Sequence, residues 1–449
     1  MNSSVFDSFL YRDMFSTAQM REVFSDTAFV ARMTETEAAL ARAQAKTGVV
    51  PHEAAQTITD SALPDSLDHE RLRVETGNVG YPVLPLVTQL AEQCGEAGGY
   101  LHWGATTQDI MDTATMLQCR DGLDLVAAAL DRVRAALRRL AAEHADTVAA
   151  GRTHLQHALP VTFGFRAAVW VSALDRHRER LAQARERDLM VQFGGAAGTL
   201  ASLGDGPEGL AVRSALATEL GLRDPGITWH VARDGLNEIV SLLAAIGGSL
   251  GKIGWDVMMM CSSEFGELAE PFVPGRGASS TMPQKRNPIS SELLVATAKL
   301  LRDKASSMLD AMMQDFERAT GPWHLEWAAV PEAFQLAASS LHQAEFMLGG
   351  LEVDVDRMRA NTSRTGGLIV AEAVMMAVAP VLGRQRAHEV VYDACRNAIE
   401  RGDDLARELR HHPELVEQLG ENRIDELCDP ANYLGSARAM TFDVVGRSE

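Results

Sequence analysis

Long stretches without proline constrain the fold of this chain more than any other feature. No proline occurs between Pro85 and Pro160, nor between Pro225 and Pro271. Proline inside a helix removes a backbone hydrogen bond and clashes with the preceding turn, so long helices require such gaps. Each gap has room for a helix of roughly 25 residues or more, which spans about 40 Å at about 1.5 Å per residue.

Apolar side chains recur at helical spacing in both gaps. Intervals of three and four residues are typical of the seam of a helix bundle, and charged residues fall off this seam. The first stripe comprises Leu123, Val126, Leu130, Val133, Leu137 and Leu140, and the second comprises Leu236, Ile239, Leu243, Ile246, Leu250 and Ile253. Two more long helices are predicted, over Phe163–Asp188 and from Ser290 to about Gln314. Convincing alternation with a period of two residues is absent, so the chain is predicted to be all-α.

Composition narrows the class of protein. The net charge of −19 argues against a nucleic-acid or anionic-membrane partner. The 5 cysteines have no CxxC spacing, and no Cys/His cluster has the spacing of metal ligands. The N-terminus lacks a basic region followed by an apolar run, and no uncharged apolar stretch of about 18 residues occurs. The sequence therefore predicts a cytoplasmic protein with no metal, no cofactor and no membrane span.

The helical pattern is interrupted at four places. These are Thr76–Pro82, Trp103–Asp109, Gly151–His154 and Pro271–Pro288. Backbone amides and short polar side chains become available at such interruptions, so function in a helical protein tends to lie there.

The segment Pro274–Pro288 carries the most chemistry. Its glycines and prolines exclude a regular element, yet it also holds two serines, a lysine and an asparagine. A solvated structural loop is one reading of this composition. The other is a flexible flap that supplies a hydroxyl base together with groups that grip a carboxylate.

Three segments carry a family resemblance. Gly277-Ala-Ser-Ser-Thr-Met-Pro-Gln-Lys-Arg-Asn-Pro288 resembles the GSSxMPxKxNP signature of the fumarase/aspartase superfamily, with Ala278 as a departure. Gly104-Ala-Thr-Thr-Gln-Asp-Ile-Met-Asp-Thr113 and Gly151-Arg-Thr-His-Leu-Gln-His157 resemble two further regions of that superfamily. Other stretches resemble its 3-carboxy-cis,cis-muconate cycloisomerase branch, a relative of adenylosuccinate lyase: Phe6-Asp7, Gln192–Gly195, Trp323–Trp327 and Tyr433–Ala437.

The resemblance implies a fold and an assembly. It implies a small N-terminal helical domain over 1–110, a central long-helix bundle over 111–355 with the catalytic loop 271–288, and a C-terminal helical domain over 356–449. It also implies a homotetramer in which three subunits build each active site. The substrate would be a small di- or tricarboxylate.

The resemblance assigns the proton-abstracting group to the loop. Ser279 matches the catalytic base, which removes a proton from the carbon next to a carboxylate. Lys285 and Asn287 match the residues that hold this carboxylate as it becomes the aci-acid. Loop amides are expected to stabilise the negative charge of the Ser279 oxygen. Ser280 either contacts the substrate or only shapes the turn.

The remaining roles fall on other segments. His154 matches the general acid that protonates the leaving group, and Glu292 matches the acid that orients it. The resemblance implies further substrate contacts by Thr106, Thr107, Gln108, Asn78, Arg152, Thr153 and Arg318. For Arg152 and Arg318, solvation at the surface is an equal reading.

Two departures bear on the choice of reaction. The segment Gly77–Tyr81 lacks the histidine that adenylosuccinate lyase presents near its nucleotide, and Ala232-Arg233-Asp234 replaces a Gln-Arg-Asp motif, which disfavours a nucleotide substrate. Bacterial carboxymuconate cycloisomerases typically carry an apolar residue at the position of His154 and lack the acid of Glu292. We therefore expect a β-elimination that releases fumarate, with an amine or nitrite as the leaving group. A lactonising cycloisomerase and an inactive, crystallin-like helical protein remain as alternatives.

Overall fold

The computed structural model describes residues 4–318 and 320–447, and its regular structure is overwhelmingly helical. The helices are α1 (Arg12–Phe15), α2 (Ala18–Val23), α3 (Asp26–Lys46), α4 (His52–Ser61), α5 (His69–Val79), α6 (Val83–Cys94), α7 (Thr107–Glu143), α8 (Phe163–Asp188), α9 (Glu208–Leu220), α10 (Asp234–Met260), α11 (Ile289–Ala311), α12 (Pro322–Gly349), α13 (Val355–Thr362), α14 (Ala371–Leu382), α15 (Arg384–Arg401), α16 (Leu405–Arg410), α17 (Pro413–Leu419), α18 (Glu421–Cys428) and α19 (Ala437–Gly446). Short 3₁₀ turns are η1 (Pro64–Ser66), η2 (Gly95–Tyr100), η3 (Ala201–Leu203), η4 (Leu368–Val370) and η5 (Pro430–Asn432).

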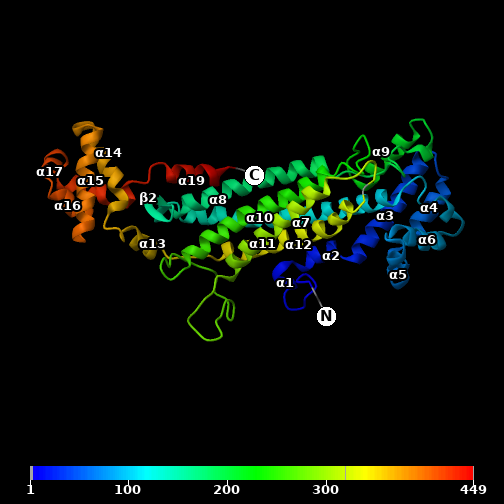
Figure 1. Cartoon of the computed structure of the whole chain (residues 1–449), viewed down its shortest axis with the longest axis horizontal. Coiled ribbons are helices and arrows are strands. Elements are labelled where there is room, and N and C mark those ends of the chain that lie inside the picture. The colour runs from blue at the N-terminus through cyan, green and yellow to red at the C-terminus, as the bar shows by residue number, and fades with distance from the viewer. Residues whose placement is uncertain (1–3, 319, 448–449) are drawn as a thin grey trace. The chain divides into compact units, whose positions relative to one another are not determined.

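The all-α prediction is confirmed, and the four expected long helices correspond to α7, α8, α10 and α11 (Figure 1). Every residue of the two predicted stripes is buried, from Leu123 to Leu140 and from Leu236 to Ile253. The stripe on α10 also makes it the one described helix that is long and apolar enough to cross a membrane, by length and composition alone. However, 56% of the apolar window of α10 is buried inside the chain, and a buried core helix passes the same test.

Two elements were missed. One is α12, which contains Pro331 in its interior, so the absence of proline could not predict this helix. The other is strand structure: β1 (Val148–Thr153) pairs antiparallel with β2 (Gln156–Thr162), and β3 (Leu268–Ala269) pairs with β4 (Glu352–Val353). The small residues of β1 give no alternation of apolar and polar side chains, so the pattern could not show it.

The chain forms two compact units, and the boundaries between them fall inside α7, α8, α10, α11 and α12. The first unit comprises 1–130, 176–251 and 295–342, and the second comprises 131–175, 252–294 and 343–449. These units do not correspond one to one with the three predicted domain ranges, which stay a prediction. In the first unit α3 packs against α4 and α9, and α5 packs against α6.

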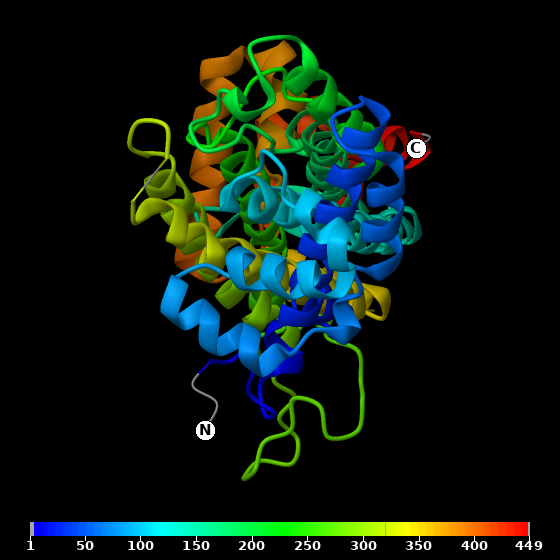
Figure 2. The same cartoon turned by 90° about the vertical axis from the view of Figure 1, so that its right-hand side faces the viewer.

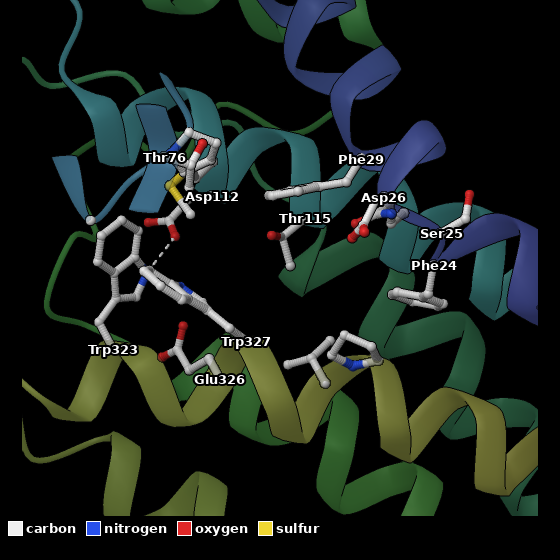
Figure 3. A pocket seen from close by; sticks show the side chains of 16 residues that line it. Phe24, Ser25, Asp26, Phe29, Thr76, Asp112, Thr115, Trp323, Glu326 and Trp327 are labelled. Carbon is white, nitrogen blue, oxygen red and sulfur yellow. Dashed lines mark hydrogen bonds between the residues drawn. The ribbon is translucent and has the colours of Figure 1, made fainter. Parts of the chain in front are cut away.

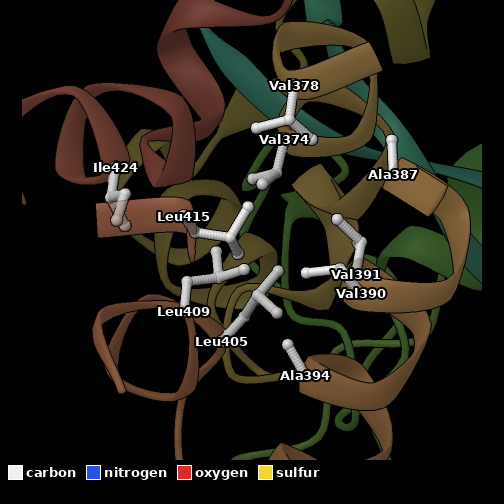
Figure 4. Packing of buried hydrophobic residues seen from close by; sticks show 10 residues of the cluster. All are labelled: Val374, Val378, Ala387, Val390, Val391, Ala394, Leu405, Leu409, Leu415 and Ile424. Carbon is white, nitrogen blue, oxygen red and sulfur yellow. The ribbon is translucent and has the colours of Figure 1, made fainter. Parts of the chain in front are cut away.

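The C-terminal helices of the second unit have a core of their own. Helices α14, α15, α16 and α17 gather closely in Figure 1. Their buried side chains face one another in Figure 4 and include Val374, Val390, Leu405, Leu409 and Leu415. A compact apolar core of this kind stabilises this end of the chain without help from the long helices.

The Pro271–Pro288 loop lacks helix and projects from the helices of its unit (Figure 2). Its base is closed: Ala278 bridges Arg286, and the Asn287 amide donates to the Gly277 carbonyl at 2.9 Å. Arg286 also donates to the carboxylate of Glu352 at 2.9 Å.

A second arginine anchors the same end of the loop. Arg276 donates to Ser290 and Gln343 at 2.7 and 2.8 Å and lies over the Phe346 ring. A fixed base therefore carries an exposed tip at 280–285.

One carboxyl group is held in an unfavourable place at the end of α8. Asp188 is buried, its Oδ2 has no hydrogen-bond partner within the described chain, and it lies at the negative end of the helix dipole. Burial and the nearby carboxylates of Glu238 and Asp234 raise its pKa to about 7, against the opposing effect of Arg187. A folded-state pKa above the unfolded value of about 3.9 means that ionisation costs stability as pH rises between these two values.

We predict that Asp188→Asn stabilises the protein at pH 8 by about 1 kcal/mol and has little effect at pH 4.5, where Asp188 is protonated. The measurement is the free energy of unfolding by denaturant at the two pH values. Glu186→Gln, on the exposed face of the same helix end, is the control and should show no such pH dependence. Equal effects of Asp188→Asn at both pH values would contradict the assignment.

We predict that Gly277→Ala disrupts the loop more than Gly275→Ala. Both glycines have positive φ (+67° and +82°), but an added Cβ at 277 would lie 2.4 Å from the Asn287 carbonyl oxygen, whereas nothing lies within 4 Å at 275. Gly275→Ala therefore reports backbone strain alone, about 1–2 kcal/mol. The measurement is the rate of limited proteolysis within 271–288, and similar rates for the two variants would show that the loop base is not closed as described.

Candidate active site

The predicted base lies in a turn that presents hydrogen-bond donors to it. Ser279 is half-buried, and its Oγ accepts from the backbone N–H of Met282 at 3.1 Å and of Thr281 at 3.3 Å. Backbone amides directed at one oxygen stabilise negative charge on it. This turn therefore favours the alkoxide form of Ser279, the form that can remove a weakly acidic proton.

The groups expected to grip the reacting carboxylate lie in the same loop. Lys285 is exposed at the tip, and its ammonium makes no hydrogen bond or ion pair with residues 4–318 or 320–447. Asn287 is half-buried at the loop base, where its backbone is tied to Gly277 and its side-chain amide makes no bond within the same residues. Both side chains are therefore available to an anion. Ser280 is exposed and directly follows Ser279, the predicted catalytic base.

The predicted general acid occupies the tip of the β1–β2 hairpin. Thr153 pairs with Gln156, so His154 and Leu155 form the two-residue turn, with φ of 52° and 62°. Two consecutive positive φ values are typical of a type I′ turn, which normally uses Asn and Gly. Side chains other than Gly in this region carry strain, and such strain tends to persist at functional sites. The turn exposes the imidazole of His154 and leaves Leu155 71% exposed.

Glu292 does not contact His154 in one chain. It is exposed on the first turn of α11, and no hydrogen bond or ion pair joins it to His154 in the part of the chain that the structure describes. Water can solvate this carboxylate in a single chain, so its pairing with His154 stays a prediction.

A second group of predicted residues meets at the N-terminus of α7, in the first unit. Arg318 Nη1 donates to Thr106 Oγ1 at 2.5 Å, although 212 residues separate them. Thr107 is the first residue of the helix. A guanidinium, a hydroxyl and free helical N–H groups together favour an anion at this point. The structure thus brings Thr106, Thr107 and Arg318 together.

The start of α7 is held by a carboxylate that the sequence reasoning did not assign. Asp109 accepts from the Thr106 amide at 3.0 Å and from the amides of Gly194 and Gly195 at 3.0 and 2.9 Å. It also pairs with the buried His230 at 2.7 Å. An acidic residue three positions after a threonine cap is the sequence signal of a capping box, which could have identified it.

Four other predicted contacts have different surroundings. Arg152 pairs with Glu267 at 2.6 Å and lies over Phe265, so its charge is neutralised within the protein and the expected anion-binding role is not supported. Gln108 is buried and donates its amide to the His230 carbonyl at 2.8 Å, which removes the donor expected to grip a carboxylate. Asn78 and Thr153 are exposed, and neither side chain has a hydrogen bond to the described residues.

The interruptions also differ slightly from those expected. Helix α5 continues through Asn78 to Val79, so the break is at Gly80–Pro82. Gly151–His154 is the end of a strand and its turn.

Acidic residues at the loop base were also missed. Glu270 accepts from the amides of Ser290 and Ser291 at 3.1 and 2.7 Å and so caps α11 directly after the loop. A carboxylate at the positive end of a helix is stabilised by its dipole. Only the proximity of Glu270 to the proline-rich segment could have suggested this role.

Comparisons with known proteins show the family of the chain. The family described as Lyase matches residues 12–301, and the family described as Adenylosuccinate lyase C-terminus matches residues 367–444. A crystal structure of a fumarate lyase from Mesorhizobium sp. BNC1 has 56% sequence identity and a TM-score of 0.91, covering 97% of this chain and 99% of that one.

The curated relatives carry out different reactions. The 3-carboxy-cis,cis-muconate cycloisomerase of Pseudomonas aeruginosa is 46% identical over 96% of this chain and 94% of its own. Trans-aconitate decarboxylase 1 of Mycosarcoma maydis is 43% identical over 97% and 88%. The nitrosuccinate lyase of Streptomyces davaonensis is 40% identical over 99% and 96%.

With a lyase match over most of its length, relatives aligned end to end and a loop that places backbone amides on a serine, the chain belongs to the lyase family of the fumarase/aspartase superfamily.

Proposed function

We propose that this enzyme catalyses β-elimination from a substituted succinate and releases fumarate, with an amine or nitrite as the leaving group. The observation that carries the proposal is His154, an ionisable imidazole held exposed at a strained hairpin tip. A departing amine must be protonated, and a histidine suits this task near neutral pH.

Each step follows from the described groups. Ser279, as the alkoxide stabilised by the amides of Thr281 and Met282, takes the proton next to one carboxylate. The electrons of the broken C–H bond delocalise into that carboxylate, and Lys285 and Asn287 hold the resulting dianion. The C=C bond then forms as the bond to the leaving group breaks. A departing amine takes its proton from His154, whereas nitrite departs as a stable anion and needs no proton. Thr106, Thr107 and Arg318 hold the second carboxylate.

We also propose that the site is completed by other subunits of a homotetramer. Leu155, beside His154, is 71% exposed, and Phe316, close to Arg318, is 90% exposed. Large apolar side chains next to catalytic groups favour burial against another subunit. Such burial would also bring Glu292 of one subunit to His154 of another, which one chain does not do. The cytoplasmic location stays a prediction.

The second candidate function is lactonisation of 3-carboxymuconate. It is favoured by the 46% identity with the cycloisomerase, against 40% with the nitrosuccinate lyase. This difference is small, so overall identity decides little. Lactonisation adds a carboxylate to a double bond and expels nothing, so it does not need the acid at His154. The third alternative, an inactive structural protein, predicts no turnover of any substrate.

We predict fumarate release from at least one succinate that bears an amino, substituted-amino, nitro or hydroxyl group, in an assay run beside 3-carboxymuconate. Ser279→Ala should lower kcat at least about 10²-fold while assembly is unchanged, because it removes the proposed base. Fumarate is followed by absorbance and assembly by size-exclusion chromatography.

The adjacent Ser280→Ala is the matched control and should retain much more activity than Ser279→Ala. Activity of Ser279→Ala close to that of the wild type would reject Ser279 as the base. Turnover of 3-carboxymuconate alone would reject elimination.

We predict that His154→Trp abolishes elimination of an amine, because the leaving nitrogen loses its proton donor, while any lactonising activity persists. Both activities are measured on the same preparation, so a folding defect would lower them together. Leu155→Ala, the other residue of the turn, serves as the control for altered hairpin geometry. Equal loss of both activities in His154→Trp, with Leu155→Ala active, would contradict the division of roles.

A further inference from the structure

The first unit holds a partly open cavity that none of the proposed catalytic groups lines. Its volume is about 300 Å³, and its walls come from α3, α7 and α12 and from the α5–α6 junction (Figure 3). Pockets of roughly 300–1,000 Å³ hold small ligands, so this cavity suits a molecule with one ring or a short chain.

Aromatic faces form much of the wall. Trp323 and Trp327 lie on α12, and Phe24 and Phe29 lie across the cavity from them in Figure 3. Tyr81 stacks on Trp323 at 5.7 Å between ring centroids and meets Trp327 edge-on, which fixes both indoles. Aromatic faces carry partial negative charge and attract cations.

The charge of the lining has one sign. Asp26, Asp112 and Glu326 line the cavity, and no Lys, Arg or His belongs to the lining. Arg233 pairs with Asp112 and Glu326 from outside the lining, at 2.7 and 2.5 Å. Arg233 balances one of the two buried carboxylates, burial raises the pKa of Glu326, and Asp26 adds a negative charge at an exposed position.

Two N–H donors at the wall already have partners. The Trp323 indole N–H already donates to Asp112 at 3.2 Å, and the Gln118 amide donates to the Val23 carbonyl at 2.8 Å. Pro331 lies inside α12 and has no N–H, so the carbonyl of Trp327 lacks its helical donor. An anion would find no cation at the wall, only hydroxyl groups such as those of Thr76 and Thr115, whereas an ammonium finds carboxylates and π faces.

We propose that this cavity is a binding site for a small organic cation, an aryl- or alkylammonium, separate from the elimination chemistry. The apolar part of the ligand lies against Trp323, Trp327 and Phe29. The ammonium is directed at the carboxylates and at the carbonyl of Trp327. The site needs only the first unit, and its test is binding alone, so the result does not depend on the proposed elimination.

The experiment is calorimetric titration of the full-length protein at pH 7.5 with benzylamine, which is cationic at that pH, and with benzyl alcohol and benzoate as neutral and anionic analogues. Benzylamine should bind at least about fivefold more tightly than benzyl alcohol, which corresponds to about 1 kcal/mol. Benzoate should bind more weakly than both.

Two variants locate the binding. Trp327→Leu removes one aromatic wall and should weaken benzylamine at least about fivefold, and Asp26→Asn should weaken it about two- to fivefold while benzyl alcohol is unaffected. Trp255→Leu, at a more exposed tryptophan elsewhere, and Asp356→Asn, at another acid in the first turn of a helix, are the controls and should leave the affinity unchanged.

Equal affinity for benzylamine and benzyl alcohol would show an apolar void only and overturn the proposal. Tighter binding of benzoate would also overturn it. If both variants bind benzylamine as the wild type does, the site lies elsewhere and the proposal fails. Because Asp26 is exposed, Asp26→Asn keeps the test decisive even if Trp327→Leu does not fold.

Discussion

The first unit depends on one buried ionic cluster. Arg233 is fully buried at the start of α10, and its guanidinium donates to Asp112 on α7 and to Glu326 on α12. Removing one partner from such a cluster leaves a charge uncompensated in a medium of low dielectric, which costs several kcal/mol. The cluster therefore fixes the relative position of α7 and α12 at the level of Asp112. One turn earlier on α7, Asp109 fixes the helix start at which Thr106 meets Arg318.

The catalytic loop is held by a different principle. Its base is closed by backbone pairing at Gly277 and Asn287 and by the ion pair of Arg286 with Glu352, whereas its tip makes few bonds to the rest of the chain. This division suits a group that must bind, react and release. The closed base keeps the two amides directed at the Ser279 oxygen, and the exposed tip leaves Lys285 free for the carboxylate contact proposed for it.

Much of this fold could be predicted because helices leave a local pattern. The stripes of α7 and α10 and the ends of α8 follow from apolar spacing and proline placement, and the loop follows from its glycines and prolines. The hairpin around His154 could not be predicted, because its turn uses two residues that rarely adopt positive φ and its strand lacks alternation. Helix α12 could not be predicted, because Pro331 lies in its interior. Packing in the folded chain offsets the free-energy cost of this proline, and the sequence does not show that packing.

The site residues divide along the same line. Ser279, Lys285 and Asn287 follow from a contiguous motif, so their joint position is a local property. Arg152 and Gln108 lie in equally distinctive motifs, yet their partners Glu267 and His230 come from more than 110 residues away and neutralise or occupy them. A motif thus identifies which residues lie near a site, whereas the remote partners decide which of them still have a charge or a donor to offer.

The same reasoning explains why the loop does not choose the product. Proton abstraction next to a carboxylate requires only Ser279, its amides and a cation, all supplied by one segment. The fate of the dianion depends on whether a proton donor stands at the leaving group. Under the proposed elimination that donor is His154, which is exposed at the tip of its hairpin, while Glu292 is exposed on another element. The proposed pairing of these two groups would then need a second chain, because no hydrogen bond or ion pair joins them within the described residues.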